Sequence, residues 1–178
     1  MAKNSGKIFE QQFKISVPDY CLLQRLNDSP QAFKRSKLTR FTPTNPCDFF
    51  LFDPIARILY CLELKSTKSK FMTFEDIDSD EEQNKLIHKH QIKSLLSFAK
   101  VKYVVAGFFF NFRDEVHGME RTYFQDATSF RKMCLSINKF SFNEMDLILN
   151  GAIKIEGKKK RVNYVWDIDK FLTSKQYE

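Results

Sequence analysis

Hydrophobic and polar residues follow two different periods along the chain, and these periods predict its elements. Ser5 can cap a first helix that places Ile8, Phe9 and Phe13 on its inner side and ends at Pro18. Apolar runs rich in aromatic and β-branched residues predict strands over residues 20–26, 47–53, 58–65, 101–112 and 121–125. Further helices are expected over residues 79–99, 126–138 and 143–149, each after a residue that can cap its first turn.

The order of these elements predicts the fold class. A helix and a strand precede a strand pair joined by the turn at Asp53-Pro54, and a helix, a very apolar strand and its partner follow. This order favours an α/β fold in which a mixed central β-sheet is flanked by helices. The length of 178 residues favours one domain over residues 1–178. Because Pro43 and Pro46 interrupt regular structure, the basic residues 31–46 are expected to form either a surface loop or a small projection, and the family resemblance given below favours a projection over residues 29–46.

Composition narrows the class of protein. Hydrophobic residues make up 43% of the chain and 19 are Phe, so we expect an aromatic core or interface. The apolar run from Tyr103 to Phe110 is too short to cross a bilayer, and residues 1–6 lack an apolar signal region. We therefore expect a cytoplasmic protein without a membrane partner. The four cysteines lack CxxC spacing, which favours buried reduced thiols over a zinc site.

Charge points to a polyanionic partner. The formal net charge is +7, and two blocks of cations carry much of it. The first block precedes the strand at 47–53 and contains Lys34, Arg35, Lys37 and Arg40; the second contains Lys158, Lys159, Lys160 and Arg161. Either block alone would be interpreted as solvated surface. Together with the acidic site described next, the two blocks favour DNA as this partner.

Two neighbouring strands carry the candidate chemistry. Asp48 opens the first strand, and Glu63-Leu64-Lys65 closes the second. Side chains alternate in a strand, so Glu63 and Lys65 point to one face and Leu64 to the other. Asp48 and Glu63 are predicted to ligate Mg²⁺ or Mn²⁺ with the Leu64 carbonyl as a third ligand, since such hard cations prefer oxygen. Lys65 can then orient the attacking water of a phosphodiester hydrolysis.

Two helical residues extend this site. Glu10 on the first helix is a candidate additional carboxylate, and Gln91 places an amide within an apolar helical stripe. Gln91 can orient water or phosphate, or it can be a core-edge residue bonded to backbone. The alternative for Glu63 and Lys65 is a surface salt bridge. His88 and His90, two apart on the expected helix, are predicted to point to nearly opposite sides.

These residues resemble the PD-(D/E)xK nuclease pattern, with Pro46 two residues before Asp48. More narrowly, residues 5–130 resemble RecU-type Holliday-junction resolvases of Gram-positive bacteria and their phages. The resemblance rests on three segments: Gly6-Lys7-Ile8-Phe9-Glu10, Glu63-Leu64-Lys65-Ser66-Thr67 and Ile87-His88-Lys89-His90-Gln91-Ile92. Relative to the family the projection is short and the spacing from Asp48 to Glu63 is long. No counterpart is evident beyond about residue 138, so the basic block there is either an added DNA contact or simply surface.

The resemblance implies a homodimer that binds DNA four-way junctions and nicks two strands symmetrically with Mg²⁺ or Mn²⁺. It implies a stalk before the acidic strand pair, which places Lys34, Arg35, Lys37 and Arg40 at the junction. Two other functions remain open. One is a restriction or repair nuclease that uses the same site on duplex or flap DNA. The other is a non-catalytic DNA-binding protein whose carboxylates only pair with lysines.

Overall fold

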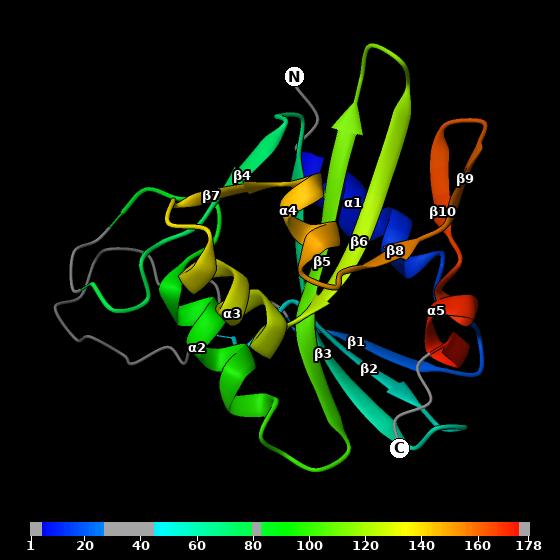
Figure 1. The fold of residues 1–178 in the computed structure, drawn as a ribbon. Coiled ribbons are helices and arrows are strands. Elements are labelled where there is room, and N and C mark those ends of the chain that lie inside the picture. The colour runs from blue at the N-terminus through cyan, green and yellow to red at the C-terminus, as the bar shows by residue number, and fades with distance from the viewer. Residues whose placement is uncertain (1–4, 27–44, 80–82, 175–178) are drawn as a thin grey trace, which may run out of the picture.

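A six-stranded β-sheet forms the centre of the computed structural model, which describes residues 5–26, 45–79 and 83–174 (Figure 1). The strands of this sheet, in spatial order, are β1 (Leu22–Arg25), β2 (Phe49–Asp53), β3 (Ile58–Thr67), β5 (Val104–Asp114), β6 (Met119–Asp126) and β8 (Ile153–Ile155). The helices are α1 (Ser5–Lys14), α2 (Lys89–Phe98), α3 (Ala127–Ser136), α4 (Glu144–Leu149) and α5 (Ile168–Ser174). Two small sheets pair β4 (Phe71–Thr73) with β7 (Ser141–Asn143) and β9 (Gly157–Lys160) with β10 (Asn163–Trp166).

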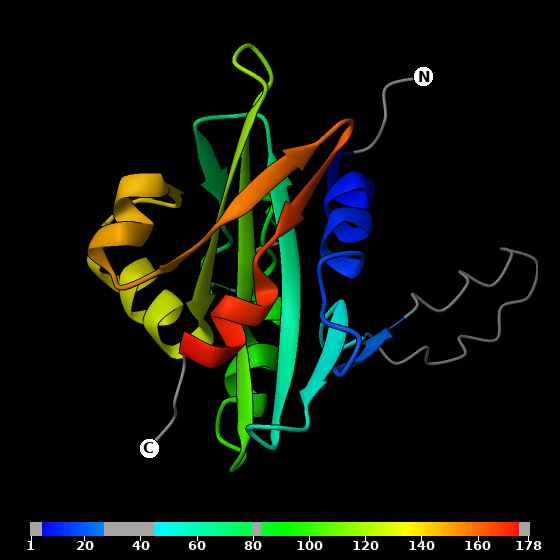
Figure 2. The same ribbon diagram turned by 90° about the vertical axis from the view of Figure 1, so that its right-hand side faces the viewer.

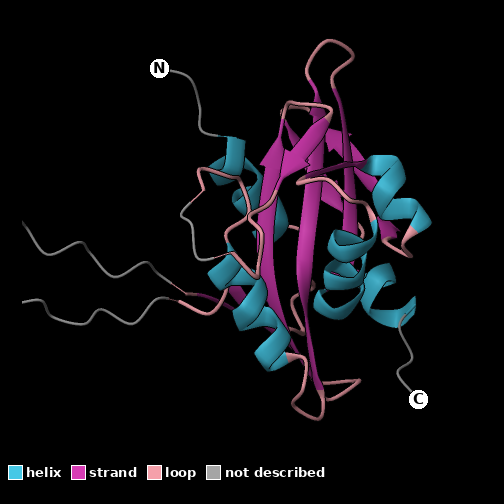
Figure 3. Ribbon diagram, turned by 60° about the vertical axis from the view of Figure 1, so that its left-hand side comes forward, coloured by secondary structure: helices cyan, strands magenta, loops and turns pink. Residues whose placement is uncertain are grey.

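The sheet is mixed, and helices lie on both of its sides (Figure 3). β3 and β5 pair in parallel, whereas the other neighbours in the sheet pair antiparallel. Apolar residues of α2 and α3 pack on one face, and those of α1 and α5 pack on the other. The predicted α/β class with a mixed, helix-flanked sheet is therefore confirmed.

Phenylalanines from alternating positions of β5 fill both cores. Phe108 and Phe110 face α3, where both rings contact Phe130 at centroid distances of 4.7 and 5.3 Å. Phe109 faces the opposite side and packs on Phe171 of α5 at 5.3 Å. One apolar strand therefore supplies both cores, because successive side chains of a strand point to opposite faces. The predicted aromatic core is confirmed.

The cysteines are free thiols, as expected. Cys47 and Cys61 are buried, whereas Cys21 and Cys134 are only half-buried. The sequence-based expectation of burial therefore holds for two of the four.

The helix predicted over residues 79–99 begins ten residues later, at Lys89. Residues before it pair with the chain after β4: the Ile87 N–H donates to the Thr73 carbonyl at 3.0 Å, and the Glu75 N–H donates to the Ile87 carbonyl at 2.9 Å. This long-range pairing holds residue 87 in an extended bridge with Phe74, so the acidic segment does not start the helix.

The chain after residue 138 contains more structure than the sequence predicted. The expected helix near residues 143–149 is present as α4, capped by Asn143, but it is not the last helix. β8, β9, β10 and α5 follow it. Their segments are three to seven residues long, too short for a clear period, and the cationic run of β9 lacks the usual residues of a strand.

The predicted projection falls almost entirely on residues 27–44, which lie outside the described residues. The same is true of Lys34, Arg35, Lys37 and Arg40. Their role and the single domain over residues 1–178 therefore stay predictions. Within the described ranges, none of the helices has the length and apolar character needed to cross a membrane.

Candidate active site

The candidate site lies where β2 ends and β3 continues. The β2–β3 ladder runs from the pair Asp53 and Ile58 to the pair Phe49 and Leu62. Beyond Leu62, β3 keeps β5 as its partner on one side, up to the pair Thr67 and Phe112. On the other side of β3, the Asp48 side chain replaces the β2 backbone as the hydrogen-bond partner: its Oδ2 accepts a hydrogen bond from the Leu64 N–H at 2.8 Å. A carboxylate thus occupies the place of a strand backbone at this edge.

The Leu64 carbonyl shares this edge for a geometric reason. Within a strand, the N–H and C=O of one residue point to the same side, and those of the next residue point to the other. Because the Leu64 N–H donates to Asp48, the Leu64 carbonyl is directed to the side on which Asp48 lies. Two types of oxygen ligand therefore converge on the end of β2.

Glu63 and Lys65 lie on the face of β3 that α2 covers, as strand alternation predicted. The Lys65 ammonium lies 3.1 Å from Glu63 Oε1, and the two side chains are only 13% and 4% exposed. The Gln91 amide nitrogen on α2 donates to the same Glu63 oxygen. The ion pair of the alternative interpretation is therefore present, but it is largely buried and does not lie at the surface.

Gln91 is held at both ends of its amide group. Its Oε1 accepts a hydrogen bond from the His88 N–H at 3.0 Å and completes a capping box at the start of α2. Its nitrogen is thereby directed to Glu63. Gln91 therefore bonds backbone, as one of the two interpretations from the sequence proposed, and it also contacts the Glu63 carboxylate; its role toward water or phosphate stays a prediction.

Glu75 fixes the start of α2 and was not identified from the sequence. Its carboxylate is buried and accepts hydrogen bonds from the Lys89 N–H at 2.7 Å and from His88 Nδ1 at 2.9 Å. Burial raises the pKa of Glu75, but the bonds from His88 and Lys89 outweigh it and leave this pKa below its usual value. The charged carboxylate therefore anchors the helix that carries Gln91.

The prediction that His88 and His90 point to opposite sides is wrong. α2 begins at Lys89, so His88 precedes the helix and does not follow its rotation. The two rings stack with centroids 5.5 Å apart and planes 9° apart. Burial lowers the pKa of His90, and the neighbouring His88 and Lys65 lower it further.

Glu10 reaches the site from α1, on the other face of the sheet, but as half of an ion pair. Glu10 Oε2 lies 2.7 Å from Nε of Arg25 on β1. Burial is the main cause that raises the pKa of Asp48, and the Glu10 charge raises it further. The Leu64 N–H, Lys65 and Arg25 oppose this shift. Arg25 was missed because a lone cation in a short strand carries no sequence signal.

The donors at this edge suit a hard divalent cation. Carboxylate and carbonyl oxygens are the ligands that Mg²⁺ and Mn²⁺ prefer. Burial disfavours the negative charge of Asp48, and a bound cation would offset this cost. Among the described residues, no group of three or more His, Cys, Asp and Glu side chains is placed to hold a metal. The fit therefore depends on Asp48, Glu63 and the Leu64 backbone together.

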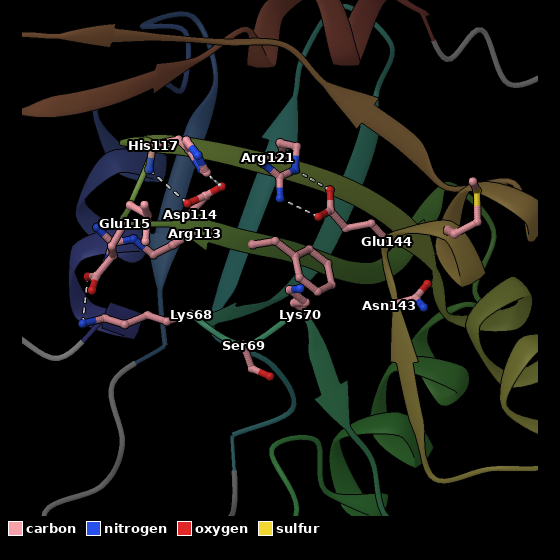
Figure 4. Close-up of a pocket in the computed structure, with 13 residues that line it drawn as sticks. Lys68, Ser69, Lys70, Arg113, Asp114, Glu115, His117, Arg121, Asn143 and Glu144 are labelled. Carbon is pink, nitrogen blue, oxygen red and sulfur yellow. Dashed lines mark hydrogen bonds and ion pairs between the residues drawn. The ribbon is translucent and has the colours of Figure 1, made fainter.

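A separate pocket of about 710 Å³ opens near the ends of β3, β5 and β6 (Figure 4). Its charged side chains are largely paired with one another. Arg121 donates two hydrogen bonds of 2.7 Å to Glu144, and Lys68 lies 2.8 Å from Glu115. This internal pairing indicates a structural role for the charges of this pocket.

The Glu144 ion pair gives a prediction for acid stability. Burial raises the pKa of Glu144, but the bonds from Arg121 and Tyr123 outweigh it, so this pKa lies below the ordinary 4.5. A carboxylate with a lowered folded-state pKa adds stability above its unfolded-state pKa and loses that contribution as the pH falls through the folded-state value. Replacing Glu144 by Gln should therefore reduce the loss of stability between pH 7 and about pH 3, measured as the shift in urea midpoint. An unchanged shift would contradict this assignment.

Comparison with known proteins gives limited similarity. No protein-family model matches the chain. The SPbeta prophage-derived uncharacterized protein YotM of Bacillus subtilis (strain 168) is 27% identical over 179 residues, covering 95% of this chain and 85% of that protein. A solved structure of Hjc, a Holliday junction resolvase from Archaeoglobus fulgidus, matches 83% of this chain and 90% of its own with a TM-score of 0.46 and 13% identity. A structural similarity at this level does not establish a shared activity.

Proposed function

We propose that this chain is a metal-dependent endonuclease of the PD-(D/E)xK type that cleaves DNA four-way junctions. The observation that carries the proposal is that the Asp48 carboxylate bonds the backbone of Leu64, the residue between the paired Glu63 and Lys65, where β2 ends on β3. A nuclease needs carboxylates for a cation and an ammonium beside the attacking water at one place. The RecU-like segments of the sequence support the choice of a junction as substrate.

Asp48, Glu63 and the Leu64 carbonyl would hold Mg²⁺ or Mn²⁺ in this proposal. The bound cation would supply charge neutralisation at the phosphate and a more acidic water. Lys65 orients the attacking water and offsets the negative charge that develops on the phosphate. Gln91 keeps the Glu63 carboxylate in place through its two hydrogen bonds. Glu10 and Arg25 adjust the electrostatic environment of Asp48 from the opposite face.

The choice of substrate also involves assembly. We propose a homodimer that presents two such sites to the junction and nicks two strands symmetrically, with Lys34, Arg35, Lys37 and Arg40 contacting its backbone. The likeness to a prophage-derived protein supports a phage origin, and we propose that the chain acts in the cytoplasm of the bacterial host. A restriction or repair nuclease with the same site would differ in how its subunits are arranged around DNA.

A panel of labelled DNA substrates tests whether the chain prefers four-way junctions. The wild-type chain is incubated with a four-way junction, a flap and a linear duplex of matched sequence in Mg²⁺ or Mn²⁺. The proposal predicts preferential cutting of the junction with paired nicks. Equal cutting of the linear duplex would contradict a resolvase and favour the restriction or repair alternative.

Replacing Gln91 by Ala should lower the cleavage rate by about tenfold to a hundredfold, as is typical when a residue that orients a metal ligand is removed. Asp146→Ala is the matched control, since Asp146 occupies the same third helical position in the capping box of α4. Both changes remove a cap, which typically costs about 1 kcal/mol of stability. Single-turnover cleavage and thermal unfolding are measured on both variants. Equal losses of cleavage would show that Gln91 acts only through helix stability.

A further inference from the structure

The β9–β10 hairpin carries a concentration of unpaired positive charge outside the main sheet. Lys158, Lys159, Lys160 and Arg161 follow one another along β9 and its turn, and all four are exposed. Their cross-strand neighbours on β10 are Val165, Tyr164 and Asn163, so the ladder contains no carboxylate. Within the described part of the chain, none of the four cations takes part in an ion pair.

Arg161 in the turn of this hairpin has an unfavourable backbone conformation. Lys160 pairs with Asn163, which leaves Arg161 and Val162 as a two-residue turn, and Arg161 has a φ of 51°. Gly or Asn is favoured at such a position because other side chains are strained there. The backbone at Arg161 is therefore strained, as it is at Arg57 in the turn between β2 and β3.

The hairpin is fixed to the body of the protein. Trp166 stacks on Tyr164 at 5.2 Å, contacts Phe9 of α1 edge-on at 6.3 Å, and donates its backbone N–H to Ser16 Oγ at 2.9 Å. Gly157 allows the Trp166 ring to lie across the hairpin, because a Cβ there would meet that ring at 2.4 Å. At the turn between β5 and β6, the Tyr164 hydroxyl donates to the Gly118 carbonyl at 3.3 Å. The four charges are therefore presented from a base anchored to α1, the helix that carries Glu10.

We propose that the β9–β10 hairpin is a second DNA-binding surface that contacts backbone phosphates of a junction arm. The inference rests on the proposed nuclease function and adds a contact to those proposed for Lys34, Arg35, Lys37 and Arg40. A row of exposed lysines with an arginine binds phosphates without reading sequence, and each contact releases condensed counterions. Four exposed cations on an anchored hairpin, without ion pairs among the described residues, suit a DNA backbone better than an apolar or cationic partner.

The turn of β2 and β3 offers a matched control for Arg161. Arg57 in this turn is also exposed, has a φ of 59°, and forms no ion pair with the described residues. The two turns lie at opposite ends of the molecule (Figure 2). Arg57→Gly and Arg161→Gly remove the same charge and relieve the same backbone strain, so both should keep or raise the temperature of thermal unfolding. Only their positions relative to DNA differ.

The test measures binding of a labelled four-way junction to the full chain, without divalent metal, from about 50 to 200 mM salt. We expect Arg161→Gly to weaken binding and to reduce the log–log salt slope by about 0.9, the value for one duplex phosphate contact. Replacing Lys158, Lys159 and Lys160 by Gln in the Arg161→Gly variant should reduce the salt slope further. Arg57→Gly should keep the wild-type slope. Equal slopes for Arg161→Gly and wild type, or equal losses for the two Gly variants, would overturn the inference.

Nicking of the same junction in Mg²⁺ separates this inference from the proposed function. If wild type nicks the junction but Arg161→Gly binds with an unchanged slope, the hairpin inference fails and the nuclease stands. If the hairpin variant loses a phosphate contact but wild type never nicks, the DNA contact stands and the nuclease fails.

Discussion

Replacing Asp48 by Asn is expected to abolish junction cleavage, with a loss on the order of 10³-fold or more, while DNA binding is kept or strengthened. The amide preserves the size of the side chain, and its oxygen can still accept the Leu64 N–H that now bonds Asp48 at 2.8 Å. It removes the negative charge that a cation requires and that repels phosphate. Because burial raises the pKa of Asp48, a neutral group there should not lower the temperature of thermal unfolding.

Single-turnover cleavage, junction binding without metal and thermal unfolding are measured on this variant. Glu156→Gln is the control, since its side chain is 58% exposed and pairs only loosely with Lys154 at 3.7 Å. The control should cleave like wild type. Full cleavage by Asp48→Asn would remove Asp48 from the site, and lost binding by a folded Asp48→Asn would indicate a structural role.

Changes at Lys65 and Glu63 should separate stability from activity. Lys65→Met leaves the Glu63 carboxylate, which is 4% exposed, without its cation. Breaking a buried ion pair from one side typically costs about 3 kcal/mol, so this variant should unfold at lower urea concentration. Adding Glu63→Gln removes the buried negative charge that Lys65 balanced and should recover most of that stability. Neither variant should cleave DNA, because one lacks the ammonium and the other also lacks a ligand carboxylate.

Urea unfolding and junction cleavage are compared for wild type, Lys65→Met, Glu63→Gln and the variant that carries both changes. The account requires a favourable coupling energy between the two positions in stability and no recovery in cleavage. Restored cleavage in the double variant would show that the pair serves the fold alone. That result would remove Glu63 and Lys65 from the proposed catalytic site.

The core of the site was predictable because its geometry follows from strand alternation. Glu63 and Lys65 are two residues apart, so a strand must place them on one face, and their 3.1 Å ion pair agrees with this. Gln91 was identified because an amide interrupted an apolar stripe, although α2 begins later than the stripe suggested.

Residues that depend on long-range pairing were not predictable. Glu75 reaches the start of α2 only because the chain after β4 pairs with residue 87, and the sequence contains no local sign of this contact. Arg25 meets Glu10 only because β1 joins the edge of the sheet beside α1. The β9 strand was missed for a different reason: consecutive lysines disfavour a strand locally, and the packing of Trp166 on α1 and Gly157 overrides that preference.

The most direct measurement of the central claim follows all four strands of a labelled junction in Mg²⁺ or Mn²⁺, with wild type, Asp48→Asn and a metal-free control. We expect paired nicks at symmetric positions in two strands by wild type with metal, and none by Asp48→Asn or without metal. Intact strands after incubation with folded, junction-binding wild type in either metal would contradict it.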